Sequence, residues 1–289
     1  MSGASTRWRL DGRTCIVTGG SKGLGLACVE ELLALGATVL FTARGADDLE
    51  KVRARLAPIH GEDRVLCVAA DVSTPAGRSA LFDRASSLFD GTLDILINNV
   101  GTNIRKPVAE ATEAEYDTMV ATNQTSAFFL CKLFLPLLRA SRSASVVNVA
   151  SAAGIRSSGT GVIYAMTKAA MVHMSEALAC EWAGYGIRVN AVCPWMAMTP
   201  LLEAAVAKDP TQLDAVKLAT PLGRLGDPAD TAGAVCFLCM PAAAYITGQV
   251  LAVDGGLAAQ GFRGPCVAPC EAPKGGDDGE RAPKARKTG

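Results

Sequence analysis

Short apolar runs, rich in β-branched residues, alternate along the chain with longer stretches of helical periodicity. The runs predict strands near residues 14–18, 38–42, 64–70, 94–97, 145–150, 187–193 and 249–253. Helices are predicted between them, the first over Leu26 to Leu35, with Gly36 as its stop. This alternation is typical of an α/β fold and predicts one doubly wound domain over residues 1–262.

A glycine-rich turn joins the first predicted strand to the first predicted helix. Its glycines are spaced Gly19-x-x-x-Gly23-x-Gly25, which departs from the usual G-x-G-x-x-G dinucleotide fingerprint. A strand, a glycine turn and a helix N-terminus together form an anion site, because free N–H groups and the helix dipole face a phosphate. Together with the predicted strand at 38–42, the turn forms a βαβ unit, which favours nucleotide binding over a plain turn.

The end of the second predicted strand bears on the choice of dinucleotide. An acid about 20 residues beyond the glycines binds the ribose 2′-OH of NAD, whereas an arginine suits the 2′-phosphate of NADP. Arg44 lies 19 residues past Gly25, and Lys22 adds a cation within the turn. Asp47 and Asp48 lie too late to be the strand-end acid. The two cations therefore favour NADP(H), although each is also typical of solvated surface.

Tyr164 and Lys168 are candidates for the chemistry, because residues four apart on a helix share one face. A phenol has a pKa of about 10, but a neighbouring ammonium and a cationic nicotinamide ring would lower it. Tyr164 could then pass a proton to or from a carbonyl or alcohol oxygen that Ser151 holds by a hydrogen bond. Because Tyr-x-x-x-Lys is common in helices, this interpretation depends on the nucleotide-binding turn.

With both motifs present, the chain resembles the short-chain dehydrogenase/reductase family over about residues 9 to 262. The motifs that carry the resemblance are Thr18 to Gly25, Asp71, Asn98-Asn99-Val100-Gly101, Asn123, Ser151, Tyr164-x-x-x-Lys168 and Pro194 to Thr199. It is most similar to the tropinone-reductase-like branch. The features of that branch are Arg7-Trp8-Arg9-Leu10, Asn98 to Asn103, Leu135-Pro136-Leu137-Leu138, Cys180-Glu181-Trp182-Ala183, Cys193-Pro194-Trp195, Tyr245 to Gln249 and Val253 to Leu257.

The resemblance implies a single Rossmann-type sheet of seven parallel strands in the order 3-2-1-4-5-6-7, with the site at the carboxyl ends of the strands. It implies a catalytic tetrad of Asn123, Ser151, Tyr164 and Lys168. Tyr164 would be the acid/base, Ser151 would bind the substrate oxygen, and Lys168 would hold the nicotinamide ribose and lower the Tyr164 pKa. Asn123 would support a water relay to Lys168 through a helix distortion.

The resemblance also implies a set of cofactor contacts. Asp71 would meet the adenine amine, Asn99 to Gly101 would line the adenine-ribose side, and the Ala197 backbone with the Thr199 hydroxyl would take the carboxamide. The full set is Gly19, Ser21, Lys22, Gly23, Leu24, Gly25, Arg44, Asp71, Val72, Asn99, Gly101, Tyr164, Lys168, Pro194, Ala197 and Thr199. The chain departs from the common family pattern at Val100 and Trp195. We interpret Val100 as a tolerated enlargement and Trp195 as a pocket wall.

The leading functional hypothesis is an NADPH-dependent carbonyl reductase. A substrate lid is predicted over about residues 196–222, and its apolar residues suggest a small lipophilic ketone or cyclic alcohol, although they would equally pack the lid onto the body. Glu203 is a weak candidate for holding an amine, and Arg105 with Lys106 would either attract an anionic substrate or face water. The alternatives are a 3-oxoacyl-thioester reductase, a non-catalytic NADP-binding regulator and an interaction protein acting through its tail.

Composition narrows the remaining possibilities. The 289 residues carry 28 basic and 28 acidic side chains, so charge gives no argument for binding nucleic acid. We expect no membrane span, no signal peptide and a cytoplasmic protein. Most of the ten cysteines lie in apolar runs and predict core packing rather than a metal site. Residues 263–289 predict a disordered tail. The resemblance implies a homotetramer or homodimer built on the helices near 113–138 and 162–183.

Overall fold

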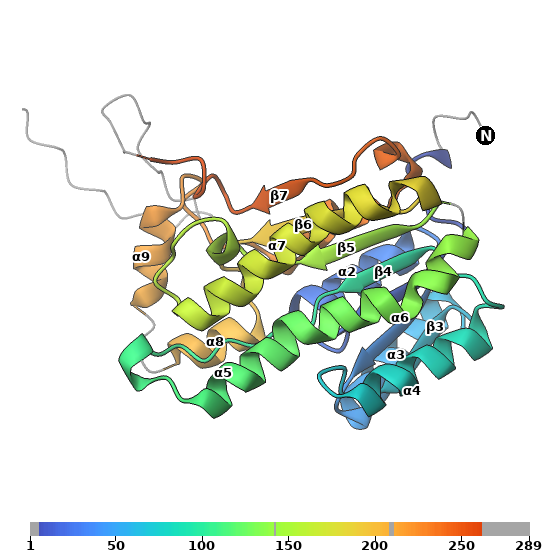
Figure 1. The fold of residues 1–289 in the computed structure, drawn as a ribbon, viewed down its shortest axis with the longest axis horizontal. Coiled ribbons are helices and arrows are strands. Elements are labelled where there is room, and N and C mark those ends of the chain that lie inside the picture. The colour runs from blue at the N-terminus through green and yellow to red at the C-terminus, as the bar shows by residue number, and fades with distance from the viewer. Residues whose placement is uncertain (1–5, 142, 208–210, 262–289) are drawn as a thin grey trace, which may run out of the picture.

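The computed structural model describes residues 6–141, 143–207 and 211–261, which form three layers around one parallel sheet (Figure 1). Its strands follow the order β3-β2-β1-β4-β5-β6-β7, as the resemblance implies. The strands are β1 (Thr14–Thr18), β2 (Thr38–Ala43), β3 (Val65–Ala69), β4 (Ile95–Asn98), β5 (Ser145–Val149), β6 (Arg188–Pro194) and β7 (Val250–Val253). All seven predicted strands are present, and each end differs from the prediction by at most one residue.

The helices occupy the predicted intervals between strands. They are α2 (Gly23–Ala34), α3 (Ala46–His60), α4 (Pro75–Leu88), α5 (Glu113–Val120), α6 (Ser126–Ser141), α7 (Val162–Trp182), α8 (Pro200–Val206), α9 (Gln212–Ala219) and α10 (Pro228–Cys239). Helix α2 begins earlier than the prediction, so that two glycines of the turn lie in its first turn. The predicted lid contains α8 and α9. Residues 208–210 of the lid and the predicted tail at 263–289 lie outside the described residues.

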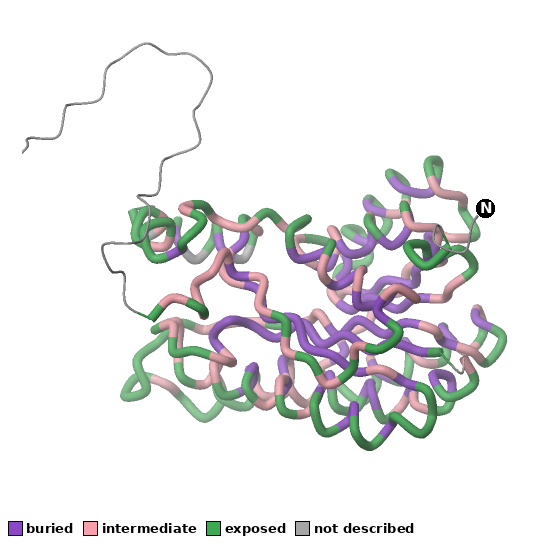
Figure 2. The backbone as a smooth tube through the Cα atoms, turned by 90° about the horizontal axis from the view of Figure 1, so that it is seen from above, coloured by how far each residue is buried: buried purple, intermediate pink, exposed green. Residues whose placement is uncertain are grey.

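The sheet is buried on both faces, which is why its strands are continuously apolar rather than alternating. One core cluster joins the sheet to α2, α3 and α10, and a second joins it to α4, α6 and α7. Figure 2 shows the buried backbone concentrated along the strands, with exposed segments around them. Within the described residues, no helix is both long and apolar enough to cross a membrane.

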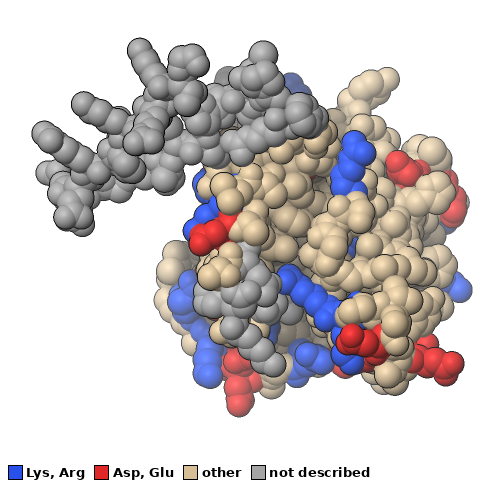
Figure 3. All heavy atoms as spheres, turned by 90° about the vertical axis from the view of Figure 1, so that its left-hand side faces the viewer, with Lys and Arg blue, Asp and Glu red and all other residues tan. Residues whose placement is uncertain are grey.

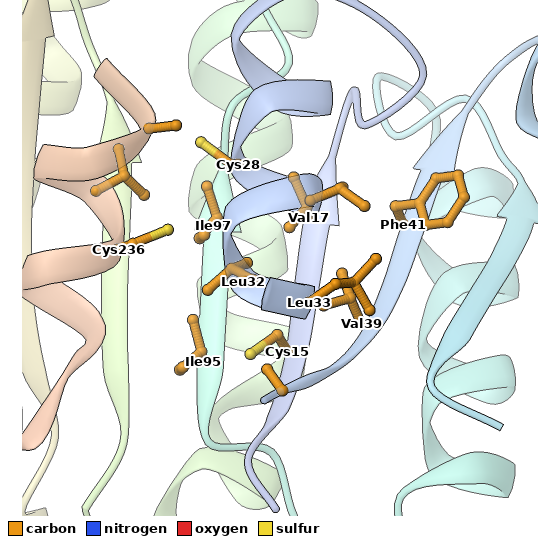
Figure 4. Close-up of a cluster of buried hydrophobic side chains, with 14 of the residues drawn as sticks. Cys15, Val17, Cys28, Leu32, Leu33, Val39, Phe41, Ile95, Ile97 and Cys236 are labelled. Carbon is orange, nitrogen blue, oxygen red and sulfur yellow. The ribbon is translucent and has the colours of Figure 1, made fainter. Parts of the chain in front are cut away.

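Most of the described cysteines pack in these cores, as predicted. Cys15 on β1, Cys28 on α2 and Cys236 on α10 lie together among aliphatic side chains (Figure 4). Burial raises the pKa of the Cys239 thiol to about 12, so it stays protonated and behaves as a small apolar group. Cys180 corrects the prediction, because it lies exposed on α7. His173, on the same helix, lies on the surface beside Glu176.

The carboxyl ends of the strands meet at one edge of the sheet, on the left of Figure 1. Strands β1 and β4 are neighbours, although β2 and β3 separate them in the sequence. The chain therefore leaves these two strands in opposite directions across the sheet, and a crevice for a ligand opens at such a switch point. All the predicted site residues lie on segments that begin at this edge.

Candidate active site

The glycine turn after β1 is built for close backbone approach. Gly19 and Gly23 have φ angles of +71° and +58°, a region that suits glycine. A Cβ added at Gly25 would lie 2.2 Å from the Gly19 carbonyl oxygen. Lys22 precedes α2 without capping it through its side chain, so the first-turn amides have no side-chain partner. This backbone cradle at a helix N-terminus fits a dinucleotide pyrophosphate.

The loop after β4 is joined to the glycine turn through Thr18. The Thr18 hydroxyl accepts hydrogen bonds from the Asn99 amide at 2.9 Å and the Val100 amide at 3.2 Å. The Asn99 side chain donates back to the Thr18 carbonyl oxygen at 2.9 Å. Thr18 was expected only as part of the motif, yet it fixes the two strands at the switch point. Local sequence patterns did not predict this role, because the two segments lie about 80 residues apart.

The residues that follow β2 and β3 lie at the same edge of the sheet, on the β3 side of the glycine turn. Arg44 and Lys22 are exposed, and within the described residues neither side chain has an ion-pair or hydrogen-bond partner. Asp47 and Asp48 lie in the first turn of α3, which confirms that they follow the strand end. The Oδ1 atom of Asp71 accepts hydrogen bonds from the backbone and side chain of Ser73.

Val72, a predicted cofactor contact, lies close behind Asp71. Its side chain is buried, and its carbonyl oxygen accepts a hydrogen bond from Arg78 at 2.9 Å. The structure thus places Val72 at the expected edge, but its carbonyl group is already engaged within the protein.

Asn123 lies in a π-helical segment (Ala121–Thr125) between α5 and α6, which is the helix distortion that the resemblance implies. Its buried side chain accepts a hydrogen bond from the Thr102 amide at 2.7 Å and donates to the Thr102 carbonyl oxygen at 2.9 Å. It also donates to the Thr167 hydroxyl, next to Lys168, at 3.0 Å. Asn123 therefore joins the loop after β4 to α7.

Ser151, Tyr164 and Lys168 meet beyond the carboxyl end of β5. Ser151 is 9% exposed, and its hydroxyl accepts a hydrogen bond from the Ala153 amide. Lys168 is buried, and its ammonium group lies 5.9 Å from the centre of the Tyr164 ring. This ammonium donates to the Val149 carbonyl oxygen at 2.8 Å. The three predicted catalytic side chains are thus brought together by a strand end and one helix face.

The pKa of Tyr164 is raised in this structure, whereas the sequence predicted that Lys168 would lower it. Burial lowers the pKa of Lys168 to about 8. Burial also raises the pKa of Tyr164, and the Ser151 hydroxyl and the Arg105 guanidinium oppose that rise. An effect of Lys168 on the Tyr164 pKa stays a prediction, because the ammonium binds the Val149 carbonyl oxygen in this structure. The sequence had not indicated that Arg105 acts on the phenol.

The segment after β6 lies against the glycine turn. Thr199 caps α8 by accepting a hydrogen bond from Leu202, and a Cβ at Gly23 would lie 3.4 Å from its methyl group. Ala197 forms a β-bridge with Gly226. A Cβ at Gly101 would lie 3.2 Å from the Lys168 ammonium. The predicted cofactor residues of the glycine turn, the β4 loop and the lid are therefore neighbours in space.

The apolar residues of the predicted lid differ in burial. Its residues Leu202 and Val206 are buried, which supports packing onto the body, whereas Met198 is exposed. A cavity of about 540 Å³ lies between the lid, α10 and the end of β7. Trp195 lines it, but the four tetrad residues do not, so a wall of the substrate pocket at Trp195 stays a prediction. Figure 3 looks onto this edge of the molecule and shows a basic side chain near its centre, with further charged side chains toward the rim.

Comparison with known proteins agrees with this geometry. A sequence profile described as "Enoyl-(Acyl carrier protein) reductase" matches residues 19–258. A chloroplastic tropinone reductase homolog of Arabidopsis thaliana is 46% identical over 256 residues, covering 89% of this chain and 79% of that protein. A tropinone reductase homolog of Datura stramonium is 41% identical over 268 residues, covering 91% and 98%. The NADP active-site complex of Pseudomonas aeruginosa RhlG matches with a TM-score of 0.81 at 34% identity, covering 88% and 99%.

The sheet order and the nucleotide cradle define a Rossmann-type oxidoreductase fold. The chain belongs to the short-chain dehydrogenase/reductase family, and within it the chain is a tropinone-reductase-like oxidoreductase acting on CH–OH groups. The cofactor of this family is a nicotinamide dinucleotide, and the solved relative described above carries NADP.

Proposed function

We propose that this protein is an NADPH-dependent carbonyl reductase, and alcohol dehydrogenase in reverse, for a small ketone with an apolar body. The observation that carries the proposal is the meeting of Ser151, Tyr164 and Lys168 at the end of β5, with Asn123 joining α7 to the β4 loop. A phenol, a hydroxyl and an ammonium at one point form a site for a carbonyl oxygen.

The four side chains have separate tasks in this proposal. When bound, the dinucleotide supplies or accepts the hydride at the carbon of the reacting group. Ser151 holds the carbonyl oxygen, and Tyr164 donates the proton that turns this oxygen into a hydroxyl. In the reverse direction, Tyr164 removes that proton. Lys168 holds the ribose and, as a cation, favours the phenolate that remains. Asn123 holds the Thr102 backbone on one side of the site and the Thr167 hydroxyl on the other.

Tyr164→Phe is the direct test. The variant keeps the ring but loses the proton donor, so turnover of ketones should fall by about a thousandfold or more, since general acid catalysis contributes about 10²–10⁴. NADPH affinity, measured by fluorescence titration, should change less than about threefold. Lys168→Met should weaken both turnover and NADPH binding, because it also removes the ribose contact. Wild-type activity in Tyr164→Phe would refute the proposed mechanism.

The preference for NADPH is supported by Lys22 and Arg44. Both are exposed cations without acidic partners in the described parts of the chain, and they flank the strand-end position that selects the ribose substituent. We expect wild-type protein to bind NADPH at least about tenfold more tightly than NADH. Arg44→Ala should bring the ratio of NADPH to NADH affinity close to one. Arg7→Ala removes a cation outside the site and should leave the ratio unchanged. Equal affinities in the wild type would reverse the cofactor assignment.

The second candidate is a reductase of 3-oxoacyl thioesters. It is favoured by one observation, the match to a profile whose description names an acyl carrier protein. A thioester panel separates the two candidates: reduction of acetoacetyl thioesters, and not of simple ketones, would select the second. Tight NADPH binding without turnover of either class would select a regulator that binds the dinucleotide.

We also propose a homodimer or homotetramer built on α5, α6 and α7. Helices α6 and α7 lie side by side on one outer face of the molecule (Figure 1), and this layer exposes large apolar side chains. They include Phe128, Phe129, Val162 and Met166. Light scattering after size exclusion should give a multiple of the monomer mass, and Phe128→Glu should reduce it. An unchanged mass in the variant would place the interface elsewhere.

A further inference from the structure

Two adjacent cations in the loop after β4 have different surroundings. The Lys106 ammonium donates a hydrogen bond to the Glu115 carboxylate at 2.5 Å, so its charge is neutralised on α5. The Arg105 side chain is exposed, and in the described parts of the chain it has neither an ion pair nor a hydrogen bond. An arginine that folding leaves without a partner at the edge of a catalytic site remains available for a ligand.

The backbone around Arg105 is firmly held. Thr102 is bound on both its backbone groups by Asn123. The Asn103 side chain donates to the Thr160 carbonyl oxygen at 3.0 Å, and the Ile104 amide donates to the Met119 sulfur at 3.5 Å. With Lys106 paired on the other side, Arg105 is the charged residue of this segment whose side chain has no hydrogen-bond or ion-pair partner among the described residues. The loop therefore carries the guanidinium at a defined place.

That place is beside the catalytic phenol. A Cβ at Gly161, three residues before Tyr164, would lie 3.5 Å from Asn103 and 3.7 Å from the Ile104 carbonyl oxygen. The loop thus lies against the start of α7. The Arg105 charge is close enough to lower the pKa of Tyr164 against the effect of burial. A substrate whose oxygen is held by Tyr164 would place its other substituents within reach of this charge.

We propose that Arg105 binds a carboxylate of the substrate, so that the substrate is an oxo acid in one direction and the hydroxy acid in the other. The guanidinium offers a planar pair of N–H donors that matches the two oxygens of a carboxylate. This inference rests on the proposed carbonyl reductase function and narrows its substrate class. Arg105 acts here in specificity, and Tyr164 remains the group that moves the proton.

Matched substrates test the inference. Wild-type protein with NADPH is assayed against 4-oxocyclohexanecarboxylate and its methyl ester, which share a ring and a ketone and differ in charge. We expect a higher kcat/KM for the acid. Arg105→Ala should lower kcat/KM for the acid by about tenfold to a hundredfold, the range of a charge-assisted hydrogen bond, and leave the ester nearly unchanged. Arg105→Lys should recover part of the loss.

Lys106→Ala is the matched control, because it removes the same charge from the neighbouring position. If long-range attraction alone draws the acid to the protein, the two alanine variants lose equally, and this outcome would overturn the proposal. A wild-type enzyme that prefers the ester would overturn it as well. An unchanged NADPH affinity in both variants shows that they are folded.

A binding measurement separates this inference from the proposed function. Cyclohexanecarboxylate has no carbonyl to reduce, so its binding to the NADP⁺-loaded protein does not require turnover. By calorimetry, wild-type protein and Lys106→Ala should bind it equally, and Arg105→Ala should bind it at least about tenfold more weakly. Carboxylate binding without turnover of any ketone refutes the carbonyl reductase alone. Ketone turnover with no Arg105-dependent carboxylate binding refutes the inference alone.

Discussion

The glycine turn and the loop that carries Arg105 lie at the same edge of the sheet, but they are built by different means. The turn depends on backbone: Gly25 packs so closely on the Gly19 carbonyl oxygen that no Cβ fits between them. The loop depends on side-chain hydrogen bonds, since Asn123 holds the Thr102 backbone and the loop's own Asn103 side chain donates to the Thr160 carbonyl oxygen. The first region offers backbone groups at a helix N-terminus, and the second presents one unpaired side chain.

This contrast explains why the two regions tolerate change differently. A side chain added in the turn displaces backbone, whereas a side chain removed from the loop at Arg105 leaves the surrounding hydrogen bonds in place. A substitution in the glycine turn should therefore reduce both the stability of the protein and its dinucleotide affinity. A substitution at Arg105 should change only the selectivity between substrates.

Between these two regions, the largest expected effect is at Gly25. Gly25→Ala puts a methyl group at 2.2 Å from the Gly19 carbonyl oxygen, where backbone must shift. We expect NADPH affinity to fall by about a hundredfold or more, with a lower melting temperature. Gly233→Ala is the control, because a Cβ there meets nothing within 4 Å on helix α10. It should be neutral or stabilising by up to about 1 kcal/mol. Similar behaviour of the two variants would contradict the backbone-contact argument.

The next largest effect is expected at Lys168, which lies between the two regions. Its titration should make the stability of the protein depend on pH. Its folded pKa of about 8 lies below the ordinary 10.5, so between these values the unfolded chain binds more protons. Its contribution to stability therefore rises with pH through this window, and the full penalty, on the order of 3 kcal/mol, is present below it. Denaturant unfolding of Lys168→Met should show an advantage over wild type at neutral pH that shrinks toward about pH 10.

The control for that measurement is Lys132→Met, which removes an exposed lysine from α6. Its difference from wild type should stay constant across the same window. A constant difference for Lys168→Met as well would mean that burial does not shift the ammonium.

The smallest expected effect is a change in the pH dependence of kcat/KM, which should distinguish Arg105 from Lys106. The guanidinium lowers the pKa of Tyr164, so removing it should raise that pKa. In the oxidation direction Tyr164 acts as a base, and its phenolate then forms at higher pH. With a neutral alcohol, the rising limb of kcat/KM against pH should move upward by less than about one unit in Arg105→Ala. It should stay in place in Lys106→Ala. A downward movement would exclude Arg105 from the surroundings of the phenol.

Much of this architecture was predicted from local pattern. The strands were predictable because parallel strands buried on both faces are continuous apolar runs. The glycine turn and the Tyr164–Lys168 pair were predictable because their geometry follows from spacing within one element. The roles of Thr18 and Thr167 were not, because their partners lie on other elements. The exposure of Cys180 was also missed, since an apolar neighbourhood in sequence does not fix which side of a helix faces the core.

The sequence by itself determined the order of elements, the glycine turn and the pairing of Tyr164 with Lys168 on one helix, since each depends on neighbours within a few residues. Only the tertiary structure decided which charges remain unpaired. Arg105 and Lys106 are adjacent cations, and the sequence left both open as anion-attracting or solvated. The fold brings Glu115 to Lys106 and leaves the Arg105 guanidinium close enough to Tyr164 to lower the pKa of its phenol. Because a charge is neutralised by whatever folding places within a few ångströms, its function depends on contacts that no local pattern records.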